Sequence, residues 1–416
     1  MSSSTVTVPL RLRRGVLRSR PAETTERWVR RRVAIAWGLL VLDVLPFTSK
    51  TWTGQSLIIP IPSIVGKLIT QGAVPAALLL AMSVNRRLLV RPNVFLCLMS
   101  LLIIESFLLI LEPQHLGTDY RTFRFAGFVA VLWLLTPWWG RRDLLLVRSH
   151  LTVLSIALGT VLLGIPIAHH TAFGEGRLDG AFWPLPPPQV AHIAAVTTGL
   201  VVMLWLGGML SGRATLAIVL VAVASLLLTH TRTALGGLIA GIIVGGLSLF
   251  KVRARARKLF ATLFVIVSIG ALTLSGIVTT YLDRGESTQQ LTDLTGRTTV
   301  WSQILTTPRN EFQVLFGFGL SNLSFNGLSI DSNWLGSYLD LGLFGVAVTA
   351  ALLLFMLVTA FLQPAGVRRA LALFLVAYCL VSSFTETGLS DASLYLLDLS
   401  VAASLLVPPI TNRSPG

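Results

Sequence analysis

Long blocks of apolar residues, separated by short polar segments, run along most of the chain. A helix needs about 20 predominantly apolar residues to cross a bilayer, with a range of about 17–25. The stretch 56–66 is apolar too, but Pro60 and Pro62 interrupt it, so an interfacial or re-entrant piece is expected there. The pattern predicts an all-α polytopic membrane protein with about twelve transmembrane helices, over 33–48, 67–84, 94–111, 125–139, 151–168, 190–210, 214–229, 233–250, 259–279, 335–362, 370–386 and 390–408.

The composition excludes several other classes of protein. Hydrophobic residues make up 53% of the chain and charged residues 12%, whereas soluble domains carry about 25% charged residues. Soluble globular and disordered classes are therefore excluded. A transmembrane barrel is disfavoured because its strands alternate apolar and polar residues. Cys97 and Cys379 both lie inside apolar runs, which excludes a disulfide framework.

The net charge of +15 comes mainly from arginines in the segments between apolar blocks. With the N-terminus in the cytoplasm, 24 Lys and Arg residues fall on the cytoplasmic side and 9 outside. This asymmetry predicts that both termini are cytoplasmic, with the strongest basic anchor at 251–258. The basic charge therefore indicates orientation and contact with lipid headgroups rather than nucleic-acid binding.

The predicted spans divide the chain into five parts. They are a basic cytoplasmic tail at 1–32, transmembrane helices 1–9 in 33–279, a large extracytoplasmic loop at 280–334, helices 10–12 in 335–408, and a short cytoplasmic tail at 409–416. The first tail has no apolar segment followed by a small-residue cleavage site, so it is not read as a signal peptide.

Polar and charged residues collect in the predicted outer segments. Two of these segments are long, at 169–189 and 280–334, and a tight turn at 228–235 lies between them. Within the longer one, Thr295 is a candidate helix cap before a helical spacing over 298–304, and 316–320 is a glycine-rich turn. Long polar loops on one side indicate a functional site on that side.

Four motifs in these segments carry a family resemblance. In order they are Thr231-Arg232-Thr233-Ala234, Gly296-Arg297 with Trp301, Gly317 with Gly319, and Asp331-Ser332-Asn333-Trp334 before Tyr338-Leu-Asp-Leu-Gly-Leu-Phe-Gly345. This order resembles the O-antigen ligase and polysaccharide polymerase superfamily of bacterial membrane proteins. The family's topology, GT-C-like with twelve helices and one large late loop, covers nearly the full chain. Many members have His-Asn at 332–333, and 280–334 contains no histidine, which favours a polymerase or a divergent transferase over a ligase.

The resemblance implies a metal-independent glycosyltransferase of cell-surface polysaccharide assembly at the bacterial cytoplasmic (inner) membrane. It would transfer or polymerise glycan in the outer leaflet, from an undecaprenyl diphosphate-linked donor to an acceptor hydroxyl. Its partners would be the lipid-linked oligosaccharide donor, a glycan or lipid acceptor, and membrane lipid. No cofactor is expected, because the sequence has no Walker A motif and no paired metal-ligand motif.

The leaving diphosphate gives the candidate catalytic residues their roles. Arginine binds phosphate oxygens bidentately and keeps its charge, so Arg232 and Arg297 are expected to bind the diphosphate. The alternatives are an interfacial arginine that snorkels, for Arg232, and a solvated loop arginine, for Arg297. Asp331 is the preferred base for the acceptor hydroxyl, ahead of Glu311, His192 and His230. The alternative for each acid is loop solvation or helix capping.

Five further residues in the outer segments are candidates for substrate binding, with Trp183 placed to stack on a sugar ring. They are Arg177, Trp183, His230, Trp301 and Asn333. Glu105 and Asp398 lie within predicted spans and are expected to face the bundle interior or a wet cavity, because charges in lipid are costly.

Two other function classes remain open. A multispan transporter or flippase of a lipid-linked or small solute would show broken helices and polar sites at the membrane midplane. A non-enzymatic scaffold would not need arginines at the membrane edge. The gathering of polar residues in the outer segments favours the glycan transferase.

Overall fold

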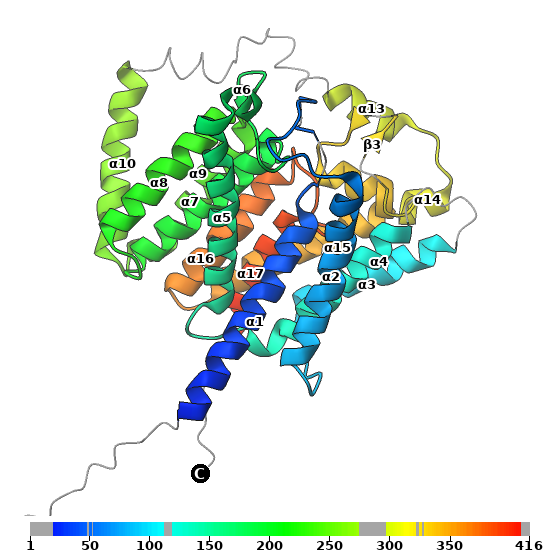
Figure 1. Cartoon of the computed structure of the whole chain (residues 1–416), viewed down its shortest axis with the longest axis horizontal. Helices are drawn as coiled ribbons and strands as arrows, with labels where there is room; N and C mark the ends of the chain where they lie inside the picture. The colour runs from blue at the N-terminus through cyan, green and yellow to red at the C-terminus, as the bar shows by residue number, and fades with distance from the viewer. Residues whose placement is uncertain are drawn as a thin grey trace, which may run out of the picture.

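The computed structural model describes residues 20–47, 50–51, 53–111, 119–273, 297–321, 324–326 and 328–408, and these are mostly helical (Figure 1). The helices are α1 (Arg20–Val44), α2 (Ser63–Val84), α3 (Val94–Ile110), α4 (Asp119–Leu135), η1 (Thr136–Trp138), α5 (Leu145–Ile167), α6 (His169–Ala172), α7 (Pro187–Leu206), α8 (Gly212–Leu228), α9 (Arg232–Phe250), α10 (Ala254–Thr273), α13 (Arg297–Thr306), α14 (Glu311–Phe316), α15 (Asn333–Leu362), α16 (Val367–Ser382) and α17 (Leu394–Leu406). The strands β1 (Phe173–Gly174) and β2 (Arg177–Leu178) form one antiparallel hairpin, and β3 (Ser324–Phe325) and β4 (Leu328–Ser329) form another.

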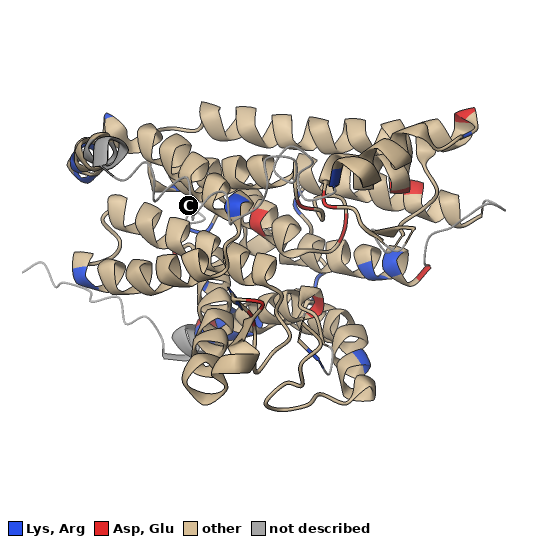
Figure 2. Cartoon of the chain, turned by 90° about the horizontal axis from the view of Figure 1, so that it is seen from above, with Lys and Arg blue, Asp and Glu red and all other residues tan. Residues whose placement is uncertain are grey.

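Each predicted span overlaps one of these helices, and residues 274–279 of the span predicted at 259–279 lie outside the described residues. Among the described residues, five helices are long and apolar enough to cross a membrane, namely α2, α5, α7, α9 and α15. Three shorter helices, α3, α8 and α17, are also apolar. Charged residues are sparse along the helices (Figure 2). The expectation of a largely helical membrane protein is confirmed at this level.

The connection between α16 and α17 is longer than predicted. Spans were expected at 370–386 and 390–408, yet α16 ends at Ser382 and α17 begins at Leu394. The reason is local, because 383–393 is rich in polar residues and ends in Ser393, whose hydroxyl accepts a hydrogen bond from the Leu396 backbone at 3.0 Å and caps α17. We call residues 383–393 the α16–α17 loop.

A stripe of glycines brings α9 and α16 close together. Gly237, Gly241 and Gly245 lie four residues apart on α9, and a Cβ at any of them would meet α16 within 2.9 Å. Glycines at this spacing let two helix backbones approach closely inside a membrane. The contact places the first residues of α9 beside the α16–α17 loop.

Most of the connections important for the site lie at one end of the bundle. In Figure 1 this is the upper end, where α6, α13 and β3 lie, opposite the first turns of α1. We call it the loop end, and define it by residues 169–186, 229–231, 297–321, 324–326, 328–332 and 383–393. The predicted loop 280–334 contributes α13, α14 and the β3–β4 hairpin, while 280–296 lies outside the described residues, as does the predicted cap Thr295.

The predicted glycine-rich turn packs directly against a break in α15. Gly317 and Gly319 have positive φ angles of 78° and 91°, as a tight glycine turn requires. Gly342 interrupts α15 with φ 61° and ψ −160°. Backbone bonds from Phe318 to Leu339 (3.1 Å) and from Gly319 to Asp340 (2.8 Å) hold the turn to the first part of α15.

Candidate functional site at the loop end

Arg177 reaches from the β1–β2 hairpin to the turn before α9. Its Nε donates to the Thr229 carbonyl at 2.9 Å, and its Nη2 donates to Thr231 Oγ1 at 3.3 Å. Thr229 and Thr231 are buried. The hairpin therefore anchors Arg177 next to the motif that contains Arg232.

The other side of the same motif contacts the α16–α17 loop. Thr233 Oγ1 and Thr385 Oγ1 are hydrogen bonded at 2.6 Å. Arg232 is the first residue of α9 and is half-buried between these two threonine contacts. The threonines of the motif thus bind neighbouring elements and fix the position from which Arg232 extends.

Arg297 and Asp331 form an ion pair across the large loop. Arg297 Nε lies 3.0 Å from Asp331 Oδ2, and Ser329 also bonds the Asp331 carboxylate. A small apolar core fixes this geometry by packing α13 against the start of α15, and it consists of Val300, Ile304, Ile330 and Leu339. The predicted helix over 298–304 is confirmed as α13, and Arg297 is its first residue.

Asn333 holds the α16–α17 loop in place. Its Oδ1 accepts hydrogen bonds from the backbone amides of Gly388 (3.2 Å) and Leu389 (2.8 Å). Its own backbone amide donates to the Ser383 carbonyl at 2.9 Å. The side chain is buried. These contacts give Asn333 a structural role in shaping the loop.

Glu386 in this loop carries a carboxyl group whose pKa is affected by three of the predicted site residues. Burial raises the pKa of Glu386 to about 7, the negative charge of Asp331 adds to the rise, and Arg297 and Arg177 oppose it. Burial lowers the pKa of the Arg177 guanidinium. The negative charge of Glu386 is among those that oppose this lowering. Three predicted site residues, Arg177 from 169–189 and Arg297 and Asp331 from 280–334, therefore act electrostatically on one carboxyl group.

Glu386 also lines a cavity of about 260 Å³ at the loop end. Two arginines of α4 line it, each paired with an acid. Arg121 binds Asp391, and Arg124 binds Asp43 with Nε to Oδ2 at 2.9 Å. The rest of the wall comes from the ends of α1, α7 and α17 and from the α16–α17 loop. The cavity is thus lined by the carboxyl groups of Glu386 and Asp391 and by two guanidinium groups that are already in ion pairs.

A buried polar network lies behind the cavity wall. His192 lines the cavity, and its Nε2 is 3.1 Å from Asp398 Oδ2. Asp398 Oδ1 is 2.8 Å from His150 Nε2, and Trp37 donates to His150 Nδ1 at 3.2 Å. Tyr378 bonds His192 Nδ1 at 3.1 Å. Both ring nitrogens of His192 thus face protein groups, so the ring orients neighbours rather than removing a substrate proton.

The remaining predicted residues lie in different surroundings. Trp183 donates its indole N–H to the Pro46 carbonyl at 2.9 Å and packs against Phe47, so it braces the α1–α2 connection. His230 has a positive φ of 52° in the α8–α9 turn. Trp301 is half-buried on α13. Glu311 is exposed at the first turn of α14.

The sequence reasoning missed the cavity residues Glu386, Arg121, Arg124 and Asp391. Glu386 and Asp391 fall inside predicted spans, and Arg121 and Arg124 enter the prediction only as outer charges. A usable signal was present in the polar run 383–393, which is too polar to continue a membrane helix.

Comparison with known proteins leaves the family of the chain open. No protein-family model matches the sequence, and no curated protein matches it. Among the described residues, no group of three or more His, Cys, Asp or Glu side chains is placed to hold a metal ion.

Proposed function

We propose that this chain is a membrane glycosyltransferase that passes glycan from an undecaprenyl diphosphate-linked donor to an acceptor hydroxyl. The observation that carries the proposal is the convergence of Arg177, Arg297, Asp331 and Glu386 at one end of a helical bundle. Arg297 and Asp331 belong to motifs that resemble the O-antigen ligase and polysaccharide polymerase superfamily. The finer topology belongs to the same proposal: twelve spans in the bacterial inner membrane, with both termini cytoplasmic.

In this proposal, the arginines stabilise the leaving group. Transfer breaks the bond between the anomeric carbon and the diphosphate oxygen, and that oxygen leaves with the electron pair. Arg177, Arg232 and Arg297 neutralise the charge that develops there. Because Arg297 binds Asp331 through its Nε at 3.0 Å, the diphosphate is bound by the Nη groups of the same guanidinium.

Glu386 acts as the base in the same step. The acceptor oxygen bonds to the anomeric carbon while its proton moves to the Glu386 carboxylate. A base works best with a pKa near the working pH, and burial raises the pKa of Glu386 to about 7. Asp331 is held by Arg297 and Ser329, so we assign it the role of positioning Arg297.

The test is transfer by the purified full-length protein. It is incubated with an undecaprenyl diphosphate-linked oligosaccharide, and glycan that has been lengthened or transferred is measured. Arg232→Lys and Arg297→Lys should each lower turnover by about 10²–10³, because an ammonium cannot reproduce a bidentate fork. Arg213→Lys, at the exposed start of α8, should leave turnover unchanged. Wild-type turnover in folded Arg232→Ala protein would exclude the diphosphate role of Arg232.

A transporter is the second candidate, and one observation favours it. His150, Asp398 and His192 form a buried polar chain inside the bundle, adjoining the cavity. Ionisable groups inside membrane bundles often mark ion or substrate pathways. Flux of a lipid-linked oligosaccharide across liposomes containing the protein, without any change in glycan length, would favour the transporter over the transferase.

A further inference from the structure

Glu105 on α3 is a buried carboxyl group separate from the site above. It is 5% exposed, and neither of its carboxylate oxygens has a hydrogen-bond partner among the described residues. A buried carboxyl without a partner is costly, and in a membrane helix such a residue usually marks a function.

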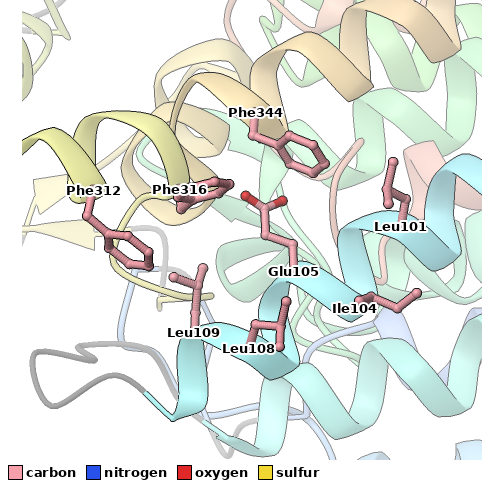
Figure 3. Close-up of a pocket in the computed structure, with 8 residues that line it drawn as sticks. All are labelled: Leu101, Ile104, Glu105, Leu108, Leu109, Phe312, Phe316 and Phe344. Atoms are coloured by element: carbon pink, nitrogen blue, oxygen red, sulfur yellow. The ribbon is translucent and has the colours of Figure 1, made fainter.

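The carboxyl group points into an apolar pocket of about 180 Å³ between α3, α14 and α15. Figure 3 shows it directed between the rings of Phe316 and Phe344, with Phe312 beyond. The ring centroids of Phe316 and Phe344 are 6.0 Å apart, and those of Phe312 and Phe316 are 5.1 Å apart. Aromatic rings attract cations through their π faces. The pocket therefore combines one acid with an aromatic wall.

The rim of the pocket is an exposed apolar surface of α3. Ile104 and Leu108 line the pocket and are 57% and 62% exposed, and Phe312 on α14 is 42% exposed. A membrane-spanning α3 would present these side chains to lipid. The entrance is thus suited to the hydrocarbon chain of an amphiphile whose head reaches Glu105.

We propose that this pocket binds a membrane lipid whose headgroup carries a positively charged ammonium group. The ammonium pairs with the Glu105 carboxylate and contacts the phenylalanine rings, while the hydrocarbon chain lies along Ile104 and Leu108. Charge complementarity selects this occupant, since an ammonium neutralises the buried carboxylate and a hydroxyl does not. The proposal is independent of the glycan-transfer activity, because Glu105 lies outside the cavity that contains Glu386.

The first test uses the full chain in dodecyl maltoside, a detergent without an ammonium group. Dicyclohexylcarbodiimide, an apolar reagent, adds to buried carboxyl groups, and the adduct on Glu105 is measured by peptide mass. Micromolar dodecyltrimethylammonium should slow this labelling about tenfold, and dodecanol should not. Equal protection by dodecanol, or no labelling of Glu105, would overturn the proposal.

The second test measures binding directly. Radiolabelled dodecyltrimethylammonium should bind wild type saturably, and Glu105→Gln should weaken binding about tenfold. Glu311→Gln, an exposed acid on neighbouring α14, is the matched control and should bind as wild type does. Unchanged affinity in Glu105→Gln would overturn the proposal. If that variant fails to fold, the protection experiment on wild type decides alone.

Discussion

The proposed transfer at the loop end depends on a single carboxyl group whose surroundings set its protonation. Burial and the negative charge of Asp331 raise the pKa of Glu386 to about 7, while Arg297 and Arg177 oppose this rise. A carboxyl group with an ordinary pKa of 4.5 would be ionised at neutral pH but would be a weak base. Small changes of charge around Glu386 therefore shift the pH range in which it accepts a proton.

Glycan transfer should depend on pH through Glu386. The base must be ionised, so kcat/KM should rise about tenfold per pH unit below about 7 and level off above it. Glu386→Gln should lower kcat about 10²–10⁴-fold and remove this rise. The exposed acid variant Glu311→Gln is the control and should keep the wild-type profile. Persistence of the rise in Glu386→Gln would assign it to another group.

Asn333 is a residue that the sequence singles out but whose contacts it does not predict. The sequence placed it in a substrate-binding motif, whereas the structure shows it bound to two amides of the α16–α17 loop. The sequence indicates that a polar residue matters at the start of a helix. It does not show which distant backbone groups that residue satisfies, because this depends on how α15 and α16 pack.

Replacing Asn333 should loosen the α16–α17 loop. Asn333→Ala leaves two buried amides without an acceptor, at a cost of about 1–3 kcal/mol each. Asn333→Asp keeps the accepting oxygen and serves as the matched variant. Thermal unfolding of the purified protein should show a clearly lower Tm for Asn333→Ala than for Asn333→Asp. Equal Tm values in both variants and the wild type would contradict the role of Asn333 in holding the α16–α17 loop.

At the scale of elements, the helices were predictable and their interruptions were not. Apolar runs such as 67–84 and 233–250 lie within α2 and α9 because length and hydropathy alone decide them. The break at Gly342 was not predicted, because the apolar pattern continues through it. Its cause is tertiary, since the backbone at Leu315 approaches too closely for any side chain there.

Position 342, where α15 packs against the start of the glycine-rich turn, should tolerate no side chain. A Cβ at Gly342 would lie 2.4 Å from the Leu315 carbonyl, at a positive φ of 61°. Gly342→Ala should therefore destabilise the protein by about 1–3 kcal/mol. Gly236→Ala is the matched control, since a Cβ there meets nothing within 4 Å. Unfolding in denaturant should separate the two variants, and similar stabilities would count against this packing.

At the scale of the whole molecule, the positions of the basic residues predict orientation. The segment 251–258 follows α9, at the end of that helix opposite Arg232, and α13 lies at the loop end. The structure therefore agrees with the sequence that these two regions belong to opposite ends of the bundle. Which end faces the cytoplasm follows only from the charge asymmetry.

Reporter fusions decide the orientation. A reporter fused after Arg257 should be active only as a cytoplasmic reporter, and one fused near Asn310 only as an external reporter. The physical reason is the excess of Lys and Arg on the side of 251–258, which resists translocation. Fusions after Arg213 provide a second cytoplasmic point. The opposite pattern would place Glu386 in the cytoplasm and remove the basis for outer-leaflet transfer.

The buried network around Asp398 has a consequence for how the chain is made. His150 on α5 and His192 on α7 enter the membrane early, yet the carboxylate that both bind is on α17, near the end of the described chain. Until synthesis reaches α17, these two polar rings lie in the bilayer without that partner. The polar network is thus completed only by α17, and a nascent chain stalled before residue 394 lacks the acid that pairs with both histidines.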